Sequence, residues 1–141
     1  ALLATILEKE PRESTARYYL SYTEAWRARA FDAMGKPADA LAAWDRAIEL
    51  DPTNDRALHV GRAGALIRLG EALVDANQFA DAEQRLLAAN AELQTPGPGV
   101  EEAATKLAVL FARLYDGWAM SEPDKGYPTK AAEWRARSQQ P

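Results

Sequence analysis

The chain has 141 residues, which is enough for one domain with a hydrophobic core of its own. Its hydrophobic share of 48% and charged share of 27% are typical of a globular protein, and its net charge of −4 does not suit a dedicated nucleic-acid binder. The absence of cysteine excludes a disulfide framework and a thiolate metal site. Alanine dominates and no window alternates strictly between apolar and polar residues, so the sequence predicts an all-α fold.

The first ten residues, ALLATILEKE, mix charged side chains into an apolar run. This mixture fits neither a signal peptide nor a membrane span, so we expect a cytoplasmic protein without a membrane partner. The run predicts a leading helix at about 2–9, the end of a unit truncated upstream. Because the chain also begins without methionine, we expect it to be part of a longer protein.

Three pairs of helices are predicted to follow. Pro11 and Pro52 break helices, as do the glycine- and proline-rich run at 96–99 and the loop at 123–128. Asn54 is a candidate N-cap. The predicted pairs are 13–34 with 37–50, 54–76 with 79–93, and 99–118 with 128–138.

The stretch GKPADALAAWDRAIELDP at 35–52 recurs in weakened form 42 residues later. The turn residue Gly35 corresponds to Asn77, and these are the two residue types that most easily adopt the left-handed conformation after a helix. A third turn at Gly126 comes 91 residues after Gly35, so the third unit holds seven extra residues, AMSEPDK at 119–125, which we expect to form a surface loop. The other pairs are Ala40 with Ala82, Trp44 with Leu86, and Ala47 with Ala89.

This spacing is that of paired helices that stack on their neighbours. Small residues at Ala28, Ala40 and Ala47 allow two helices to approach closely, while Phe31 and Trp44 fill the space beside them. One helical hairpin cannot bury its own apolar face, so successive hairpins share a continuous core.

With these motifs the chain resembles the tetratricopeptide repeat family. The resemblance implies an αα-hairpin solenoid over 1–141, with about seven helices in three hairpins plus the leading helix. The units are 11–52, 53–95 and 96–141, with 1–10 left from the truncated unit. Two departures are Glu24 and Arg27, where the family expects Trp and Leu. The matches are Ala28, Phe31, Ala40, Trp44, Ala47 and Pro52 in the first unit, and Leu66, Leu69, Gly70, Leu73, Ala82, Leu86 and Ala89 in the second.

The last third of the chain has a narrower resemblance. LYDGW at 114–118, followed by AAEWRAR at 131–137, is similar to the closing unit of long-period repeat arrays found C-terminal to bacterial serine/threonine protein kinase domains. The kinase signatures themselves are not in this sequence, which has no HRD and no DFG.

The sequence offers no constellation for chemistry. His59 and Asp55 are too few ligands for a metal site, and the PGPG run at 96–99 lacks the Lys-Ser/Thr of a phosphate-binding loop. None of the four serines lies in a nucleophile elbow. We therefore predict a protein that is not an enzyme and that uses no cofactor or metal.

The family resemblance implies that the first helices of successive units line a concave groove. The ligand-facing positions correspond here to Tyr22, Ala25, Trp26, Arg29 and Asp32; Gly64, Ile67, Arg68, Glu71 and Val74; and Lys106, Val109, Leu110, Arg113 and Asp116. From these the candidate partner-binding residues are Tyr22, Trp26, Arg29, Arg68, Glu71, Leu110 and Arg113.

Tyr18, Tyr22 and Trp26 also form a stripe at helical spacing, and aromatic and arginine side chains dominate interface hot spots. A packing explanation stays open, in which these rings lie under the leading helix at 2–9. In the same explanation three i, i+3 charge pairs are ordinary solvent-exposed pairs on the helix surface and do not mark a binding site. They are Arg29–Asp32, Arg68–Glu71 and Arg113–Asp116.

Two functional hypotheses follow. The first is a protein-interaction module that binds an extended or helical segment of a protein or peptide in the groove. The alternative is a structural spacer or self-assembly domain of a larger protein, which would form homo-oligomers. Neither hypothesis includes a nucleic-acid or membrane partner.

Overall fold

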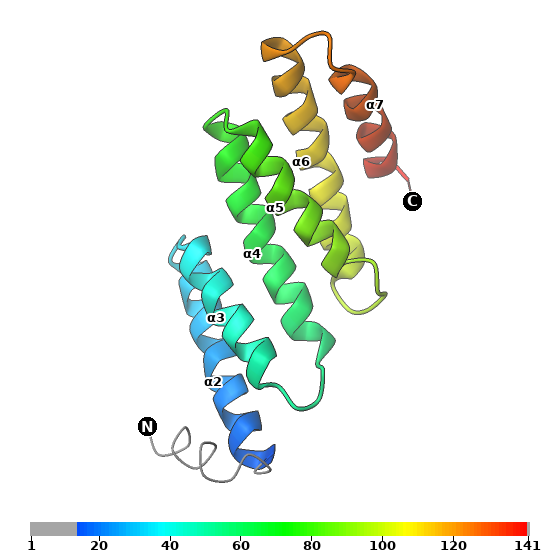
Figure 1. Cartoon of the computed structure of the whole chain (residues 1–141). Helices are drawn as coiled ribbons and strands as arrows, with labels where there is room; N and C mark the ends of the chain where they lie inside the picture. Colours follow the sequence, from blue (N-terminus) through cyan, green and yellow to red (C-terminus); the bar gives the residue numbers. More distant parts are fainter. Residues whose placement is uncertain (1–13, 141) are drawn as a thin grey trace. The chain divides into compact units, whose positions relative to one another are not determined.

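The computed structural model describes residues 14–140, and every regular element among them is a helix. The predicted all-α fold of helical hairpins is thereby confirmed, while the predicted leading helix at 2–9 and the break at Pro11 lie outside the described residues. The helices (Figure 1) are α2 (Ser14–Ala33), α3 (Pro37–Leu50), α4 (Arg56–Asp75), α5 (Phe79–Glu92), α6 (Val100–Ser121) and α7 (Tyr127–Ser138).

The chain divides into two compact units, Ala1–Ala65 and Leu66–Pro141. The boundary falls inside α4 rather than between two predicted hairpins. The first unit contains α2, α3 and the first half of α4, and the second contains the rest of α4 with α5, α6 and α7.

The three turns within the helix pairs use the residues that the repeat pattern picks out. Gly35, Asn77 and Gly126 have φ angles of 71°, 59° and 77°, in the left-handed region that glycine and asparagine tolerate best. The amide of Gly35 donates to the carbonyl of Asp32 at 3.1 Å, and that of Asn77 donates to the carbonyl of Val74 at 3.0 Å. The prediction of left-handed turns is therefore confirmed at all three positions.

Two local predictions were wrong. Asn54 does not cap α4; it has a φ of 55°, and the side chain of Asp55 accepts the N–H of Ala57 at 2.9 Å instead. The predicted loop at 119–125 is partly helical, because α6 continues to Ser121. The loop is therefore shorter than the seven extra residues, and α6 is the longest of the described helices at 22 residues.

The core of the first unit forms where small side chains let α2, α3 and α4 approach one another. Ala28, Ala40 and Ala47 are fully buried, and Trp44 is 3% exposed among them. Gly61 of α4 lies directly against the Trp44 ring: a Cβ atom added at Gly61 would come within 2.5 Å of it. Only a glycine allows the indole to lie this close to the helix backbone.

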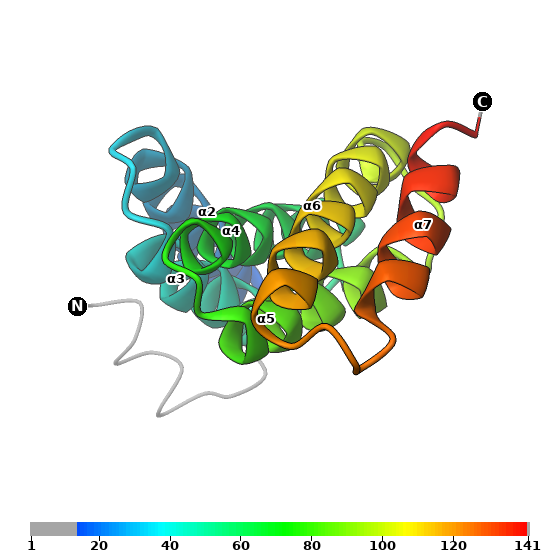
Figure 2. The same cartoon turned by 90° about the horizontal axis from the view of Figure 1, so that it is seen from above.

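In the second unit a stack of buried and half-buried aromatic rings joins α6 to α7, which lie side by side in Figures 1 and 2. The rings of Phe111 and Trp134 are 4.1 Å apart at 14°, and those of Trp118 and Tyr127 are 4.3 Å apart at 16°. Tyr115 stacks beside Phe111 at 6.0 Å. Ala131 is the one fully buried residue among those described in α7. Because a single alanine buries little surface, the aromatic contacts are what attach α7 to the unit.

Tyr115 also links α6 to α5, because its hydroxyl donates to the Glu83 carboxylate at 2.6 Å. Burial raises the pKa of Tyr115 well above its ordinary value of 10.0, and the bond to Glu83 raises it further. The folded protein thus keeps this hydroxyl protonated at pH values where the unfolded chain ionises, so its contribution to stability is present below about pH 10 and is lost as the pH rises further.

We expect this linkage to be visible in a Tyr115→Phe variant. Above about pH 10 the free energy of unfolding of the wild-type protein should fall more steeply than that of the variant, by up to about 1.4 kcal/mol per pH unit. Urea denaturation at a series of alkaline pH values measures both slopes. Equal slopes would show that Tyr115 is not the group responsible.

Candidate functional site

One side of α2 is held against α3. Ser21 donates from Oγ to the carbonyl of Ala47 at 2.8 Å, and Ala25 and Ala28 share a core with α3. Away from this packed side α2 carries four exposed aromatic residues: Tyr18 (48% exposed), Tyr19 (55%), Tyr22 (50%) and Trp26 (56%). We call these four side chains the aromatic face.

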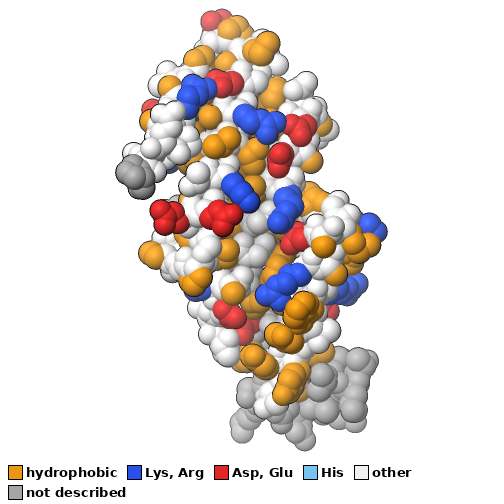
Figure 3. All heavy atoms as spheres, turned by 180° about the vertical axis from the view of Figure 1, so that it is seen from behind, with side chains coloured by type: hydrophobic (Ala, Val, Ile, Leu, Met, Phe, Trp, Pro, Cys, Tyr) orange, Lys and Arg blue, Asp and Glu red, His pale blue; other side chains and the backbone are white. Residues whose placement is uncertain are grey.

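The aromatic face is an ordered array rather than four separate rings. The rings of Tyr18 and Tyr22 are 6.4 Å apart at 15°, and those of Tyr22 and Trp26 are 6.0 Å apart at 78°. Tyr19 meets Tyr18 edge to face at 5.7 Å. The other aromatic side chains among residues 14–140 are buried or half-buried. Figure 3 shows hydrophobic side chains gathered over α2, with Lys and Arg side chains beside them.

Arg29 continues this array by one turn of the helix. Its guanidinium carbon lies 5.4 Å from the Trp26 ring and 5.5 Å from the Trp44 ring, within cation–π distance of both. The Asp32 carboxylate, predicted to pair with Arg29, instead accepts the Trp44 Nε1–H at 3.2 Å. In the described part of the chain the contacts of Arg29 are with aromatic rings and not with a carboxylate.

The candidate residues of the second unit form a separate charged group. Arg113 of α6 pairs with Asp75 at 2.6 Å and with Glu71 at 3.8 Å, both on α4. The predicted Arg113–Asp116 pair is therefore wrong, and Asp116 pairs with Arg135 of α7. Arg113 therefore connects α6 to α4 and does not form a pair within its own helix. Arg68 is exposed on the same stretch of α4.

Leu110 does not belong to an exposed surface. It is 5% exposed and packs in the core of the second unit, so its assignment as a partner-binding residue was wrong. The same holds for three other positions derived from the family, which are also buried: Ala25, Ile67 and Val74. Leu110 lies among the buried residues of α6 at 107–115, whereas Val109 and Arg113 in the same stretch are exposed.

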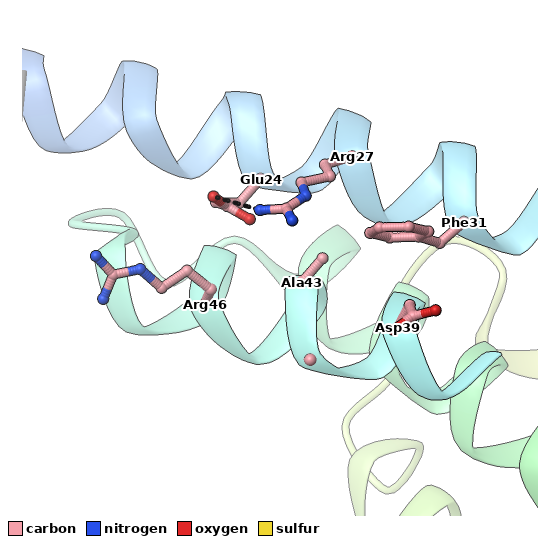
Figure 4. A pocket seen from close by; sticks show the side chains of 7 residues that line it. Glu24, Arg27, Phe31, Asp39, Ala43 and Arg46 are labelled. Atoms are coloured by element: carbon pink, nitrogen blue, oxygen red, sulfur yellow. Dashed lines mark ion pairs between the residues drawn. The ribbon is translucent and has the colours of Figure 1, made fainter. Parts of the chain in front are cut away.

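A hollow of about 260 Å³ lies on another side of the α2–α3 hairpin. Figure 4 shows Glu24, Arg27 and Phe31 projecting from α2 toward Asp39 and Arg46 on α3. Arg27 pairs with Glu24 at 3.8 Å and lies 5.5 Å from the Phe31 ring. Because two arginines and two carboxylates line it, the hollow favours neither an anion nor a cation.

A second hollow, of about 410 Å³, adjoins the aromatic face near the start of α2. It is lined by Tyr18 and Tyr19 from the aromatic face, by Thr15, and by Pro52 and Thr53 from the turn before α4. That turn is fixed by Asp51, which accepts the N–H and hydroxyl of Thr53 at 2.9 and 2.7 Å. Burial opposes ionisation of Asp51, but these bonds and the N–H of Asp55 outweigh it and lower its pKa.

Residues 24–54 match the family model described as tetratricopeptide repeat. The first hairpin is similar to a tetratricopeptide repeat. The matched stretch runs from Glu24 of α2 through α3 to the turn before α4. Such repeats are in general non-catalytic scaffolds for protein–protein interactions. No curated protein and no solved structure matches the chain.

The tetratricopeptide-like hairpin presents three of the predicted residues together, Tyr22, Trp26 and Arg29. Tyr19 was missed, because it is not on the i, i+4 stripe, although its position beside Tyr18 on the helix was readable from the sequence. Of the described residues, no three or more His, Asp or Glu side chains gather as a metal site would need. No helix within 14–140 combines the length and the apolar character that a membrane span requires.

Proposed function

We propose that the chain is a non-catalytic protein-interaction module that binds a segment of a partner protein on the first helices of its hairpins. One observation carries the proposal: the exposed aromatic side chains of the described chain lie on one face of α2, next to Arg29. Leaving four such rings in water forgoes the free energy of burying them. A concentrated patch of this kind is typical of a surface that a partner covers.

Residues of the second unit extend the proposal. Arg68, Glu71 and Arg113 are exposed and charged on α4 and α6, and we assign them to polar contacts with the same class of partner. Exposed charges of this kind contribute more to specificity and association rate than to affinity. The aromatic face is therefore expected to supply most of the binding free energy.

Affinity capture from a lysate of the source organism tests the proposal. A protein retained by the wild-type chain should be lost with the variant Tyr22→Ala/Trp26→Ala and weakened with Arg68→Glu/Arg113→Glu. The matched controls are Leu87→Ala, which removes a 48% exposed apolar side chain from α5, and Arg85→Glu, also on α5. Circular dichroism should show every variant folded. Equal retention by the aromatic variant and by Leu87→Ala would contradict the proposal.

The structural-spacer hypothesis remains the alternative. It predicts that the chain captures only itself, and that sedimentation shows a larger species as the concentration rises. A setting next to a bacterial kinase domain, and a cytoplasmic location, stay predictions of the sequence.

A further inference from the structure

We propose that the aromatic face of α2 binds an extended acidic segment of a partner protein, with alternate apolar side chains on Tyr18, Tyr22 and Trp26 and a carboxylate beyond them on Arg29. This inference rests on the proposed function and specifies the chemistry of the partner. Three features of the first unit support it: the spacing of the rings, the tyrosine hydroxyls that make no hydrogen bond with residues 14–140, and the charge on the surface.

The spacing of the rings suits an extended chain. Successive ring centroids along the stripe are 6.4 and 6.0 Å apart. In an extended segment every second side chain points to the same side, at intervals of about 6.6 to 6.8 Å. The mismatch is below about 1 Å per step, so three alternate side chains can each meet one of the three rings.

The hydroxyl groups favour an extended partner over a helical one. Tyr18, Tyr19 and Tyr22 make no hydrogen bond with any described residue, so their hydroxyls can donate and accept. An extended segment brings unpaired backbone N–H and C=O groups that need such partners, whereas a helix satisfies its own. The hollow of about 410 Å³ beside Tyr18 and Tyr19 leaves room for such a segment at the same end.

Charge complementarity fixes the acidic end of the partner. Both carboxylates of α2 have partners of their own: Glu24 pairs with Arg27, and Asp32 accepts the N–H of the Trp44 indole. The exposed side of α2 thus presents the Arg29 charge with rings on either side and no described carboxylate paired to it. Arginine binds carboxylates through paired N–H donors, and such bonds are about twice as strong as neutral ones.

The position of Arg29 also sets where the carboxylate lies. Arg29 is three residues beyond Trp26, which is about 4.5 Å along the helix axis. An acidic residue one or two positions after the last apolar side chain of the partner reaches that point. Either an Asp or Glu side chain or a C-terminal carboxylate supplies the required group.

Selection from a displayed library of random peptides, with the full chain immobilised, tests this inference. Enriched peptides should share three apolar residues at alternate positions followed by Asp, Glu or a free C-terminus, and Trp26→Ala should abolish their enrichment. Comparing a library with free C-termini against one with blocked C-termini separates the two sources of carboxylate.

Calorimetry with one enriched peptide then tests the role of Arg29. Replacing the peptide's acidic residue by its amide should weaken binding about tenfold, and Arg29→Gln should do the same. When both changes are made together, the loss of affinity should not exceed the loss caused by either change alone. With the control Arg85→Gln the chain should still bind the acidic peptide more tightly than its amide. The inference is overturned if the neutral peptide binds as tightly as the acidic one. It is also overturned if the apolar residues of the enriched peptides are three and four positions apart, which is the spacing of a helix.

These outcomes separate the two proposals. If enriched peptides depend on Trp26 but carry no acidic residue, the partner chemistry is wrong and the interaction module stands. If no enriched peptide depends on Trp26, and capture from lysate is also unchanged, both proposals fail.

Discussion

Replacing Trp44 by alanine should lower the free energy of unfolding by about 3–5 kcal/mol. The indole is 3% exposed, fills the space between α2, α3 and Gly61 of α4, and donates its N–H to Asp32. Its loss leaves a large cavity, and the neighbouring side chains of Ala28, Ala40 and Ala47 are too short to fill it. Thermal and urea denaturation measure the change.

Two control variants show whether this loss comes from the core. Trp44→Leu introduces the residue found at the corresponding position of the second unit, and it should lower the free energy of unfolding clearly less than Trp44→Ala does. Trp26→Ala removes the same side chain from a 56% exposed site and should stay within about 0.5 kcal/mol of the wild type. If Trp26→Ala were as destabilising as Trp44→Ala, the aromatic face would be part of a core, and its assignment as a binding surface would be wrong.

A Phe111→Ala change should have an effect of similar size in the second unit, about 3–5 kcal/mol. Phe111 is fully buried, and its ring lies between those of Trp134 and Tyr115. Because α7 is attached mainly through this stack, its backbone amides should lose protection against hydrogen exchange before those of α4 and α5.

Two changes on the same helix serve as controls for Phe111. Phe111→Leu keeps much of the buried volume and should cost less than about 1.5 kcal/mol. Val109→Ala changes a 47% exposed side chain and should be nearly neutral. Unchanged exchange protection of α7 in Phe111→Ala would show that the aromatic stack is not what holds this helix.

The helices and turns were predictable because their signals are local. Gly35, Asn77 and Gly126 mark turns through their own backbone preferences, and the helix boundaries follow from these and from nearby prolines. Ala40 and Ala47 were recognisable as close-packing positions because they recur with the repeat. The aromatic stripe was visible for the same reason, since i, i+4 spacing needs no knowledge of other helices.

The side-chain partners were not predictable because they depend on a second helix. Arg113 was paired with Asp116 by sequence spacing, but α4 brings Asp75 and Glu71 closer. Asp32 was assigned to Arg29, but the indole of Trp44 reaches it from α3. Leu110 shares a helix with exposed residues, and only the packing of the second unit shows that it is buried.

The placement of the four tryptophans gives each unit its own optical signal. Trp26 and Trp44 lie in the first unit, and Trp118 and Trp134 in the second. If the second pair is replaced by phenylalanine, the remaining fluorescence comes from one exposed and one buried indole of the same hairpin. A ligand that covers α2 would shift the Trp26 emission toward the blue, whereas unfolding would shift that of Trp44 toward the red. One emission spectrum would then distinguish occupancy of the binding surface from loss of the fold that carries it.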